Sequence, residues 1–321
     1  MQTKTLRLLV ARATALLLVL LSAYPTMASV PCQDQCSEAT ETHLPVCVWQ
    51  DTARSPKGVV LLLHGIAERA LTLNHLAQKL VSDGFLVYGL DERGHGWWHF
   101  RQTKNDPGYN SDFKQTVCDV DKVLSCLKKE HPSLPLFVIG ESIGAAIALR
   151  AAVDKPDAVD GIVVSGSGYK TAPASMRWVL GDLLRNFWRW NHQINVVRYQ
   201  LKYCTDDLSS FAENLKDPEH RRTFTINETI RAGRFIGQNR KFARRLDPHI
   251  AVLVIQGAND HVLSPKSARK VFDAVNTADK RFVVVPECGH LLLQVNNMKP
   301  LVSDSITTFL SERVSRPAAC Y

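Results

Sequence analysis

The sequence predicts an α/β protein whose central sheet is mostly parallel, with helices on both faces and a helical cap inserted between two strands. Three observations support this prediction. Short apolar runs alternate with helical patterns from about residue 45 onward, which is typical of repeated βα units. Residues 167–247 interrupt that alternation. Finally, a Gly-x-Ser-x-Gly turn at 140–144 separates an apolar run from a small-residue helix, as at a sharp strand-to-helix junction.

Composition narrows the class of protein before any motif is considered. The 321 residues are 45% hydrophobic and 22% charged, which excludes a collagen-like, low-complexity or largely disordered chain. No run of the sequence approaches the roughly 20 consecutive apolar residues that a membrane-spanning helix needs. A multi-span membrane protein is therefore excluded.

The first 28 residues have the pattern of a secretory signal peptide. Lys4, Arg7 and Arg12, with no acidic residue, precede the apolar run 15–21 and a small residue at Ala28. We expect residues 1–28 to be removed and the protein to be secreted or periplasmic. The alternative is an uncleaved N-terminal membrane anchor, for which this apolar run is short.

Eight cysteines follow the predicted leader. An even number of cysteines behind an export signal favours disulfide bonds, although the sequence leaves their pairing open. The cysteines are Cys32, Cys36, Cys47, Cys118, Cys126, Cys204, Cys288 and Cys320.

The expected strands are apolar runs of the kind buried on both faces of a parallel sheet, and the expected helices show apolar residues three or four apart. In chain order, strands are expected at 43–51, 58–63, 85–90, 136–139, 158–164, 252–256 and 282–285, and helices at 71–82, 111–129, 143–152, 267–274 and 301–314. The core domain then comprises residues 29–166 and 248–321, and the cap comprises residues 167–247, expected to be helical rather than strand-like.

The positive charge of the chain is concentrated in the cap. Residues 171–245 contain 14 Lys and Arg but 7 Asp and Glu, a surplus of +7, against +8 for the whole chain. A basic surface of this kind is suited to peripheral contact with an anionic membrane, and we expect no nucleic-acid partner for an exported protein. The stretch around Trp178 and Trp188 either forms an apolar wall for a ligand or packs the cap onto the core.

Ser142 is the candidate nucleophile, at the centre of the Gly-x-Ser-x-Gly turn. A serine hydroxyl is a weak nucleophile without a base, so a histidine and an acid should follow. Asp260 comes just after the strand at 252–256, and His290 follows the strand at 282–285. A structural Gly-Ser turn is the alternative interpretation. Glu287 is a poorer acid candidate because it is too close to His290 in the chain.

Two backbone amides are expected to bind the negative charge that develops in acyl transfer. The loop after the strand at 58–63 begins His64-Gly65-Ile66, and it can offer the N–H of Ile66 towards the serine. The N–H of Ile143, directly after Ser142, supplies the second donor. His64 is expected to be structural.

Together these segments resemble the α/β-hydrolase superfamily. The resemblance is to its monoacylglycerol lipase/lysophospholipase-like branch, also called the serine aminopeptidase S33 or Hydrolase 4 group, and it spans about residues 43–314. It implies an α/β-hydrolase fold, the triad Ser142, Asp260 and His290, and an oxyanion hole at Ile66 and Ile143. The motifs that carry it are HGIAER (64–69), DERGHG (91–96), GESIG (140–144), VLVIQGAND (252–260) and PECGH (286–290).

Two departures from the family pattern bear on the substrate. Arg69 stands where the family often has His, and Trp97 and Trp98 replace a small polar residue. Both tryptophans are candidate substrate-binding residues, together with Trp178 and Trp188. His95 and His99 are spaced like zinc ligands on a helix, but the flanking glycines favour a loop and no accompanying Glu is present. We expect no metal and no cofactor.

The sequence therefore predicts an exported serine hydrolase that cleaves acyl esters of a lipid or small molecule through an acyl-enzyme. An aminopeptidase or amidase with the same triad is one alternative, although the cap lacks the acidic surplus that would favour a substrate ammonium. A non-catalytic binding module on a hydrolase scaffold is the other.

Overall fold

A computed structural model describes residues 29–30, 43–173, 175–177, 181, 189 and 191–314. The predicted leader, residues 1–28, lies outside the described residues, as do Trp178, Trp188, Cys32, Cys36 and Cys320. Within the described part of the chain, none of the helices has the length and apolar character needed to cross a membrane.

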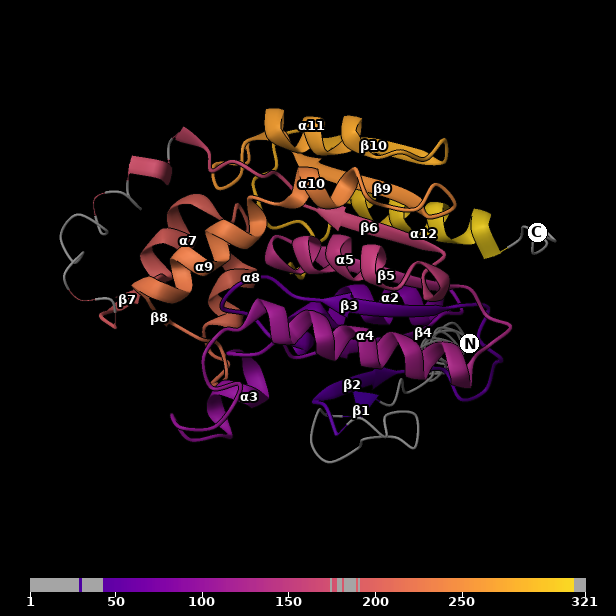
Figure 1. The fold of residues 1–321 in the computed structure, drawn as a ribbon, viewed down its shortest axis with the longest axis horizontal. Coiled ribbons are helices and arrows are strands. Elements are labelled where there is room, and N and C mark those ends of the chain that lie inside the picture. The colour runs from indigo at the N-terminus through magenta and orange to yellow at the C-terminus, as the bar shows by residue number, and fades with distance from the viewer. Residues whose placement is uncertain are drawn as a thin grey trace, which may run out of the picture.

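The centre of the molecule is an eight-stranded sheet (Figure 1). All neighbouring pairs from β4 to β10 are parallel, while β2 runs antiparallel to β4 and to β1. The sequence-based prediction of a mostly parallel sheet is confirmed. In spatial order the strands are β1 (Ser29–Val30), β2 (Val46–Trp49), β4 (Leu86–Leu90), β3 (Val59–Leu63), β5 (Leu136–Glu141), β6 (Gly161–Ser165), β9 (Ala251–Gly257) and β10 (Lys280–Val285).

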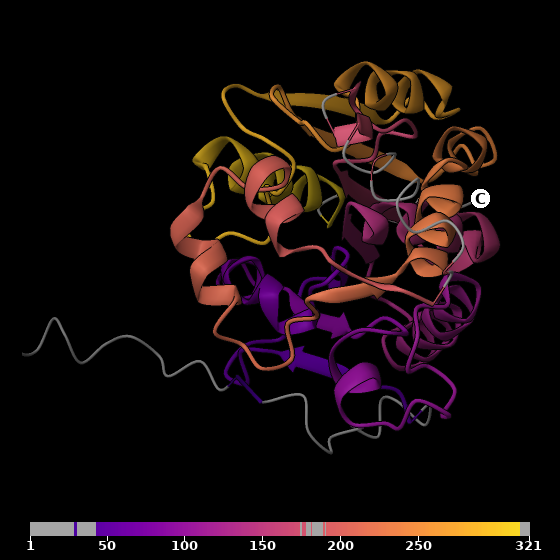
Figure 2. The same cartoon turned by 90° about the vertical axis from the view of Figure 1, so that its left-hand side faces the viewer.

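Helices cover both faces of the sheet, as predicted (Figure 2). Side chains alternate along each strand, so Leu61 and Leu63 of β3 pack in one core layer while Val60 and Leu62 pack in the other. Each such buried side chain stabilises the fold by about 1.5–3 kcal/mol. The first layer includes α4 (Phe113–Glu130), α5 (Ile143–Asp154), α10 (Asn239–Ala243) and α11 (Pro265–Ala274), and the second includes α2 (Asn74–Ser82) and α12 (Pro300–Val314).

Three short helices join the longer elements: η2 (Ala70–Leu73), α3 (Gly96–Phe100) and η3 (Pro156–Ala158). The loop predicted around His95 and His99 is in fact α3. The side chain of Asp91 explains the difference, because its Oδ2 accepts a hydrogen bond from the backbone N–H of Trp97 at 2.8 Å. That contact satisfies an N–H group at the start of the helix that has no partner within it.

The predicted cap, residues 167–247, lies at one end of the sheet (Figure 1). It contains two short strands that the sequence analysis did not predict. They pair antiparallel with Ile194 opposite Phe224, and these two side chains are buried while their neighbours in each strand are more exposed. Three residues are too few for a recognisable alternating pattern. The elements here are β7 (Gln193–Asn195), α7 (Val197–Tyr203), α8 (Leu208–Asn214), β8 (Thr223–Thr225) and α9 (Ile226–Ile236).

A buried arginine of the cap, Arg221, ties the cap to the core. Both side chains of the Arg221–Glu228 pair are 1% exposed, and their charged atoms are 2.8 Å apart. The Arg221 guanidinium also donates to the carbonyl oxygen of Gly94 at 2.7 Å, and its backbone N–H donates to Ala67 O at 2.9 Å. Because an unpaired buried charge is costly, this arginine holds the cap in a fixed position over the loop that contains Ala67.

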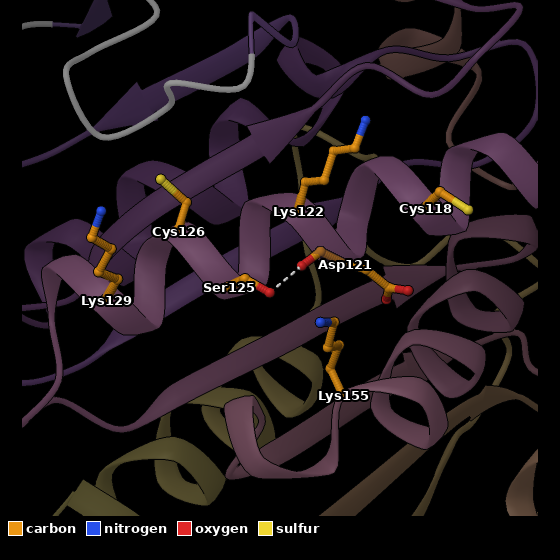
Figure 3. Close-up of a pocket in the computed structure, with 7 residues that line it drawn as sticks. All are labelled: Cys118, Asp121, Lys122, Ser125, Cys126, Lys129 and Lys155. Carbon is orange, nitrogen blue, oxygen red and sulfur yellow. Dashed lines mark hydrogen bonds between the residues drawn. The ribbon is translucent and has the colours of Figure 1, made fainter.

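The prediction of disulfide bonds fails for four of the eight cysteines. Cys118, Cys126, Cys204 and Cys288 form no disulfide bond, whereas Cys47 is disulfide-bonded. Cys118 and Cys126 lie on the same helix, α4 (Figure 3). At about 1.5 Å per residue they are about 12 Å apart along its axis, beyond the roughly 7 Å between Cα atoms that a disulfide can bridge.

Candidate active site

Ser142 occupies the sharp turn between β5 and α5. Its φ of 60° and ψ of −114° are unusual for a residue with a side chain. The surrounding structure holds this conformation, since the backbone N–H of Ser142 donates to Ser165 O on the neighbouring strand at 2.9 Å. Strained backbone of this kind persists only where neighbouring contacts impose it.

The two glycines that flank Ser142 are required by close backbone approach. A Cβ on Gly140 would collide with the carbonyl oxygen of Gly144, and a Cβ on Gly144 would collide with the carbonyl oxygen of Leu63. Only a residue without a side chain fits at either position. The spacing of the motif therefore follows from the packing of α5 against β5 and β3.

The structure brings the three predicted triad residues together. His290 Nε2 lies 2.8 Å from Ser142 Oγ, and His290 Nδ1 lies 2.8 Å from Asp260 Oδ2. Asp260 follows β9 and His290 follows β10, so their side chains meet at the carboxyl edge of the sheet, where Ser142 follows β5. Glu287, the poorer acid candidate, does not hold this position.

The carboxylate of Asp260 is fixed by further hydrogen bonds. Its Oδ1 accepts from the backbone N–H groups of Val262 at 2.8 Å and Leu263 at 2.9 Å. Its Oδ2 accepts from Gln256 Nε2 at 2.9 Å as well as from His290. These donors leave the carboxylate little freedom, so it holds the imidazole ring in one orientation.

Charge and burial act in opposite directions on this pair. Burial disfavours the charged form of both groups. For His290 the burial effect is outweighed by the nearby Asp260 carboxylate, by their hydrogen bond and by the charge of Glu141, so the pKa is raised above its usual 6.5. For Asp260 burial is outweighed by His290 and by the hydrogen-bond donors, so the pKa is lowered. A charged Asp260 beside His290 is the favoured state near neutral pH.

Ile66 and Ile143 line the same cavity as Ser142 and His290. The carbonyl oxygen of Gly65 accepts hydrogen bonds from His64 Nδ1 at 2.8 Å and from Glu68 N at 3.2 Å. The described residues contain no cis peptide bond, so in the Gly65–Ile66 peptide the Ile66 N–H points opposite to this oxygen. His64 therefore orients that N–H, which agrees with the structural role predicted for it.

The backbone N–H of Ile143 is the second donor that the sequence analysis predicts. It is the first residue of α5, and the first N–H groups of a helix have no partner within the helix. The positive end of the helix dipole favours a negative charge at the same place.

The cavity beside Ser142 is largely apolar and has a volume of about 190 Å³. Cap residues such as Ile194, Val196 and Phe224 form one wall, and Val262 and Leu263 from the core form another. The cap therefore supplies much of the surface that a ligand would contact.

Polar groups are clustered at one part of this cavity. Glu68 and Gln200 line it, and both are buried. Among the described residues, neither carboxylate oxygen of Glu68 nor Gln200 Oε1 has a hydrogen-bond partner. The ring of His220, which is also buried, lies 3.4 Å from Glu68 Oε2. Buried polar atoms without partners are costly, so this cluster is suited to a ligand that carries hydrogen-bond donors.

The structure does not place Trp97 or Trp98 among the cavity residues. Trp98 packs in the core, donates from its indole Nε1 to Asp91 O at 3.1 Å, and lies under the guanidinium of Arg93 at 3.6 Å. Trp97 packs half-buried against the same core layer. The other two predicted substrate-binding residues, Trp178 and Trp188, lie outside the described residues.

A second, wider surface groove runs along α4 (Figure 3). Its volume is about 660 Å³, and its lining includes Ser125, Asp121 and Lys122. No histidine lines it to act as a base for the serine. In the part of the chain that the structure describes, no group of three or more His, Cys, Asp or Glu side chains is arranged to hold a metal ion.

Sequence reasoning missed several polar residues near the site. Glu68 and Glu141 lie within the quoted motifs HGIAER and GESIG, but nothing in a single sequence distinguishes a buried carboxylate from an exposed one. Gln200 and His220 belong to the cap, where no motif was recognised. Gln294 lies just past the PECGH motif.

Comparisons with known proteins place the chain in a family. Residues 54–296 match the family model described as serine aminopeptidase, S33. The chain belongs to this family. It is 32% identical to human monoglyceride lipase over 307 residues, which are 92% of this chain and 94% of the human protein. It is 26% identical to the monoacylglycerol lipase of Mycolicibacterium smegmatis over 270 residues, 79% of this chain and 88% of that protein.

Solved structures show the same fold. One is a soluble variant of the Saccharomyces cerevisiae monoglyceride lipase in complex with a substrate analog, with a TM-score of 0.74 and 20% identity over 92% of this chain and 99% of that one. Another is a Bacillus coagulans carboxyl esterase in complex with glycerol, with a TM-score of 0.69 and 18% identity over 85% and 95% of the two chains. The predicted resemblance to the monoacylglycerol lipase-like branch of the α/β-hydrolases is confirmed, and this S33 protein is a serine hydrolase of the ester-cleaving kind.

Proposed function

We propose that this S33 hydrolase cleaves monoacylglycerols or closely related acyl esters through Ser142, His290 and Asp260. The observation that carries the proposal is the continuous hydrogen-bonded relay from Ser142 Oγ through the His290 ring to Asp260, which opens onto an apolar cavity. A nucleophile, its base and an orienting acid within hydrogen-bond distance are what acyl transfer requires.

The reaction would proceed in two halves. Ser142 Oγ attacks the ester carbonyl carbon while its proton moves to His290 Nε2, and Asp260 stabilises the imidazolium that forms. The N–H groups of Ile66 and Ile143 bind the negative oxygen of the tetrahedral intermediate. His290 then gives the proton to the departing alcohol oxygen, which leaves an acyl-enzyme. Water repeats the sequence and releases the fatty acid.

The lining of the cavity supports a monoacylglycerol substrate. Its apolar walls can surround an acyl chain, while Glu68, Gln200 and the nearby His220 can accept hydrogen bonds from the hydroxyl groups of glycerol. Relatives that are monoacylglycerol lipases by name support the same substrate class. An amide substrate is the competing candidate, because an amidase would use the same relay.

Export and membrane contact remain proposals from the sequence. The basic and apolar leader supports export, which N-terminal sequencing of the mature protein would test. Membrane contact is supported by the basic cap and by two exposed leucines there, Leu201 and Leu208. Co-sedimentation with anionic vesicles, compared with neutral ones, would test that contact.

Replacing the nucleophile tests the proposal most simply. Ser142→Ala should lower kcat for a monoacylglycerol at least about 10³-fold, because no other group can form the acyl-enzyme. The same variant should lose labelling by a fluorophosphonate probe. Ser125→Ala, which removes an exposed hydroxyl from α4, is the matched control and should keep full activity. An S142A protein that retained esterase activity, or a wild type that cleaved only aminoacyl-anilides, would contradict the assignment.

The pH dependence of kcat/KM tests the role of His290. A general base must be neutral, so activity should fall as pH drops through an apparent pKa above 6.5, in the direction that Asp260 and Glu141 shift this group. Asp260→Asn removes the largest raising influence and leaves burial in place, so the acid limb should move to lower pH. The rate should also fall by about 10⁴-fold. An acid limb at the same pH in both proteins would argue that His290 is not the base.

Glu68 provides a test of the glycerol-binding role. Glu68→Gln keeps the shape but removes the charge, so KM for a monoacylglycerol should rise about 10-fold, the loss expected for one charge-assisted hydrogen bond. The p-nitrophenyl ester of the same fatty acid lacks the glycerol, so its kcat/KM should change less than about 2-fold. Glu213→Gln, at an exposed ion pair with Lys216 in the cap, is the control. Equal losses on both esters would show that Glu68 does not recognise the glycerol.

A further inference from the structure

The carboxylate of Glu141, next to the nucleophile in the motif, is buried and fully hydrogen-bonded. Its Oε1 accepts from Ser165 Oγ at 2.8 Å on β6, and from the backbone N–H groups of Leu292 at 2.7 Å and Leu293 at 3.0 Å. Its Oε2 accepts from Gln294 Nε2 at 2.8 Å. Three of these donors belong to the segment that directly follows His290. Glu141 therefore joins the nucleophile strand to the histidine loop.

Gln294 extends this connection to a third segment. Its Oε1 accepts a hydrogen bond from the backbone N–H of Gly65 at 3.2 Å, and the hydroxyl of Thr72 lies 3.3 Å from the same oxygen. A Cβ on Gly65 would lie 2.8 Å from Gln294 Nε2, so the absence of a side chain at Gly65 permits this close approach. The chain of hydrogen bonds runs from Gly65 N–H to Gln294 and from Gln294 to Glu141.

The Gly65 end of this hydrogen-bond chain lies directly before the Ile66 amide in the backbone. Gln294 fixes the N–H on one side of Gly65, and His64 Nδ1 fixes its carbonyl oxygen on the other at 2.8 Å. That carbonyl group and the Ile66 N–H belong to the same planar peptide unit. A small rotation at Gly65 would therefore turn the Ile66 N–H to a different direction.

We propose that Glu141 and Gln294 are positioning residues, whose hydrogen-bond chain to Gly65 holds the Ile66 amide in place relative to Ser142 and His290. The proposal rests on the proposed function, since it concerns the oxyanion hole of that reaction. Neither side chain lines the cavity, so both act through the segments that they hold. Misplacing a catalytic group by about 1 Å can cost about 100-fold in rate.

The order of donors and acceptors along this hydrogen-bond chain provides a specific test. In Glu141→Gln, the amide oxygen must stay where it accepts from Ser165, Leu292 and Leu293, so the new NH₂ group faces Gln294. The Gln294 amide must then turn its oxygen towards residue 141, which points its own NH₂ at the Gly65 N–H. Two donors face each other, and the link to Gly65 is lost with almost no change in side-chain volume.

Adding Gln294→Glu to that variant restores the pattern. One oxygen of the new carboxylate accepts from the NH₂ group introduced at position 141, and the other accepts from Gly65 N–H. Every hydrogen bond of the native chain then has a donor and an acceptor again, with the negative charge moved by one side chain. A second substitution that raises the activity of the first would show direct coupling between the two positions.

We expect Glu141→Gln to lower kcat for a monoacylglycerol by about 10- to 100-fold, up to the loss of one oxyanion donor, while KM changes less than about 3-fold. Glu141→Gln/Gln294→Glu should recover kcat to within about 5-fold of wild type. Gln294→Met keeps the length of the side chain without its amide, and it should resemble E141Q in both kinetic constants. If E141Q does not fold, comparing the double variant with Q294M decides the same question.

Gln115 offers a matched control on α4, where its amide donates to Asp119 Oδ1 at 3.2 Å. Gln115→Glu makes the same glutamine-to-glutamate change as Gln294→Glu, but beside Asp119, and should leave kcat unchanged. A double variant no faster than E141Q, or single variants with wild-type kcat, would overturn the positioning role while fluorophosphonate labelling of the wild type still supports the proposed function. A wild type with neither esterase activity nor labelling would overturn both.

Discussion

The arrangement of the site depends on one side chain, His290, hydrogen-bonded on one side to Ser142 and on the other to Asp260. The two partners lie 118 residues apart in the chain, and they meet because β5 and β9 are parallel strands of the same sheet that end at the same edge. Parallel strands are joined by crossovers, so each loop beyond that edge is free to carry one functional group. The unusual backbone conformation of Ser142, together with the glycines at 140 and 144, places the serine hydroxyl within hydrogen-bond distance of His290.

The surroundings of that relay come from two sources. The core supplies Asp260 with its hydrogen-bond donors. It also supplies Glu141, whose hydrogen bonds join the nucleophile strand to the loop that carries His290. The cap supplies an apolar wall and the polar residues Gln200 and His220, and Arg221 anchors it to the core. The core therefore carries the Ser142–His290–Asp260 relay, while core and cap together form the walls of the cavity beside it, as on a scaffold whose sites vary from one protein to another.

The sequence predicted the core well because each strand is a continuous apolar run and the Gly-x-Ser-x-Gly turn has a fixed steric cause. It also predicted that Ser142, Asp260 and His290 would meet. It failed where tertiary contacts decide: Asp91 stabilises α3 around histidines expected in a loop, and β7 and β8 are too short to show alternation. Trp98 looked like a ligand residue but packs in the core. Partners such as Gln294 and Gly65, 229 residues apart, leave no trace in local sequence.

A crystal structure of the protein inhibited by a long-chain alkylphosphonate would test the central claim most directly. The phosphorus should be bonded to Ser142 Oγ, with the phosphonyl oxygen about 3 Å from the amide nitrogens of both Ile66 and Ile143, and with the alkyl chain between the cap and Leu263. An adduct on another residue, or a phosphonyl oxygen turned away from both amides, would contradict this account.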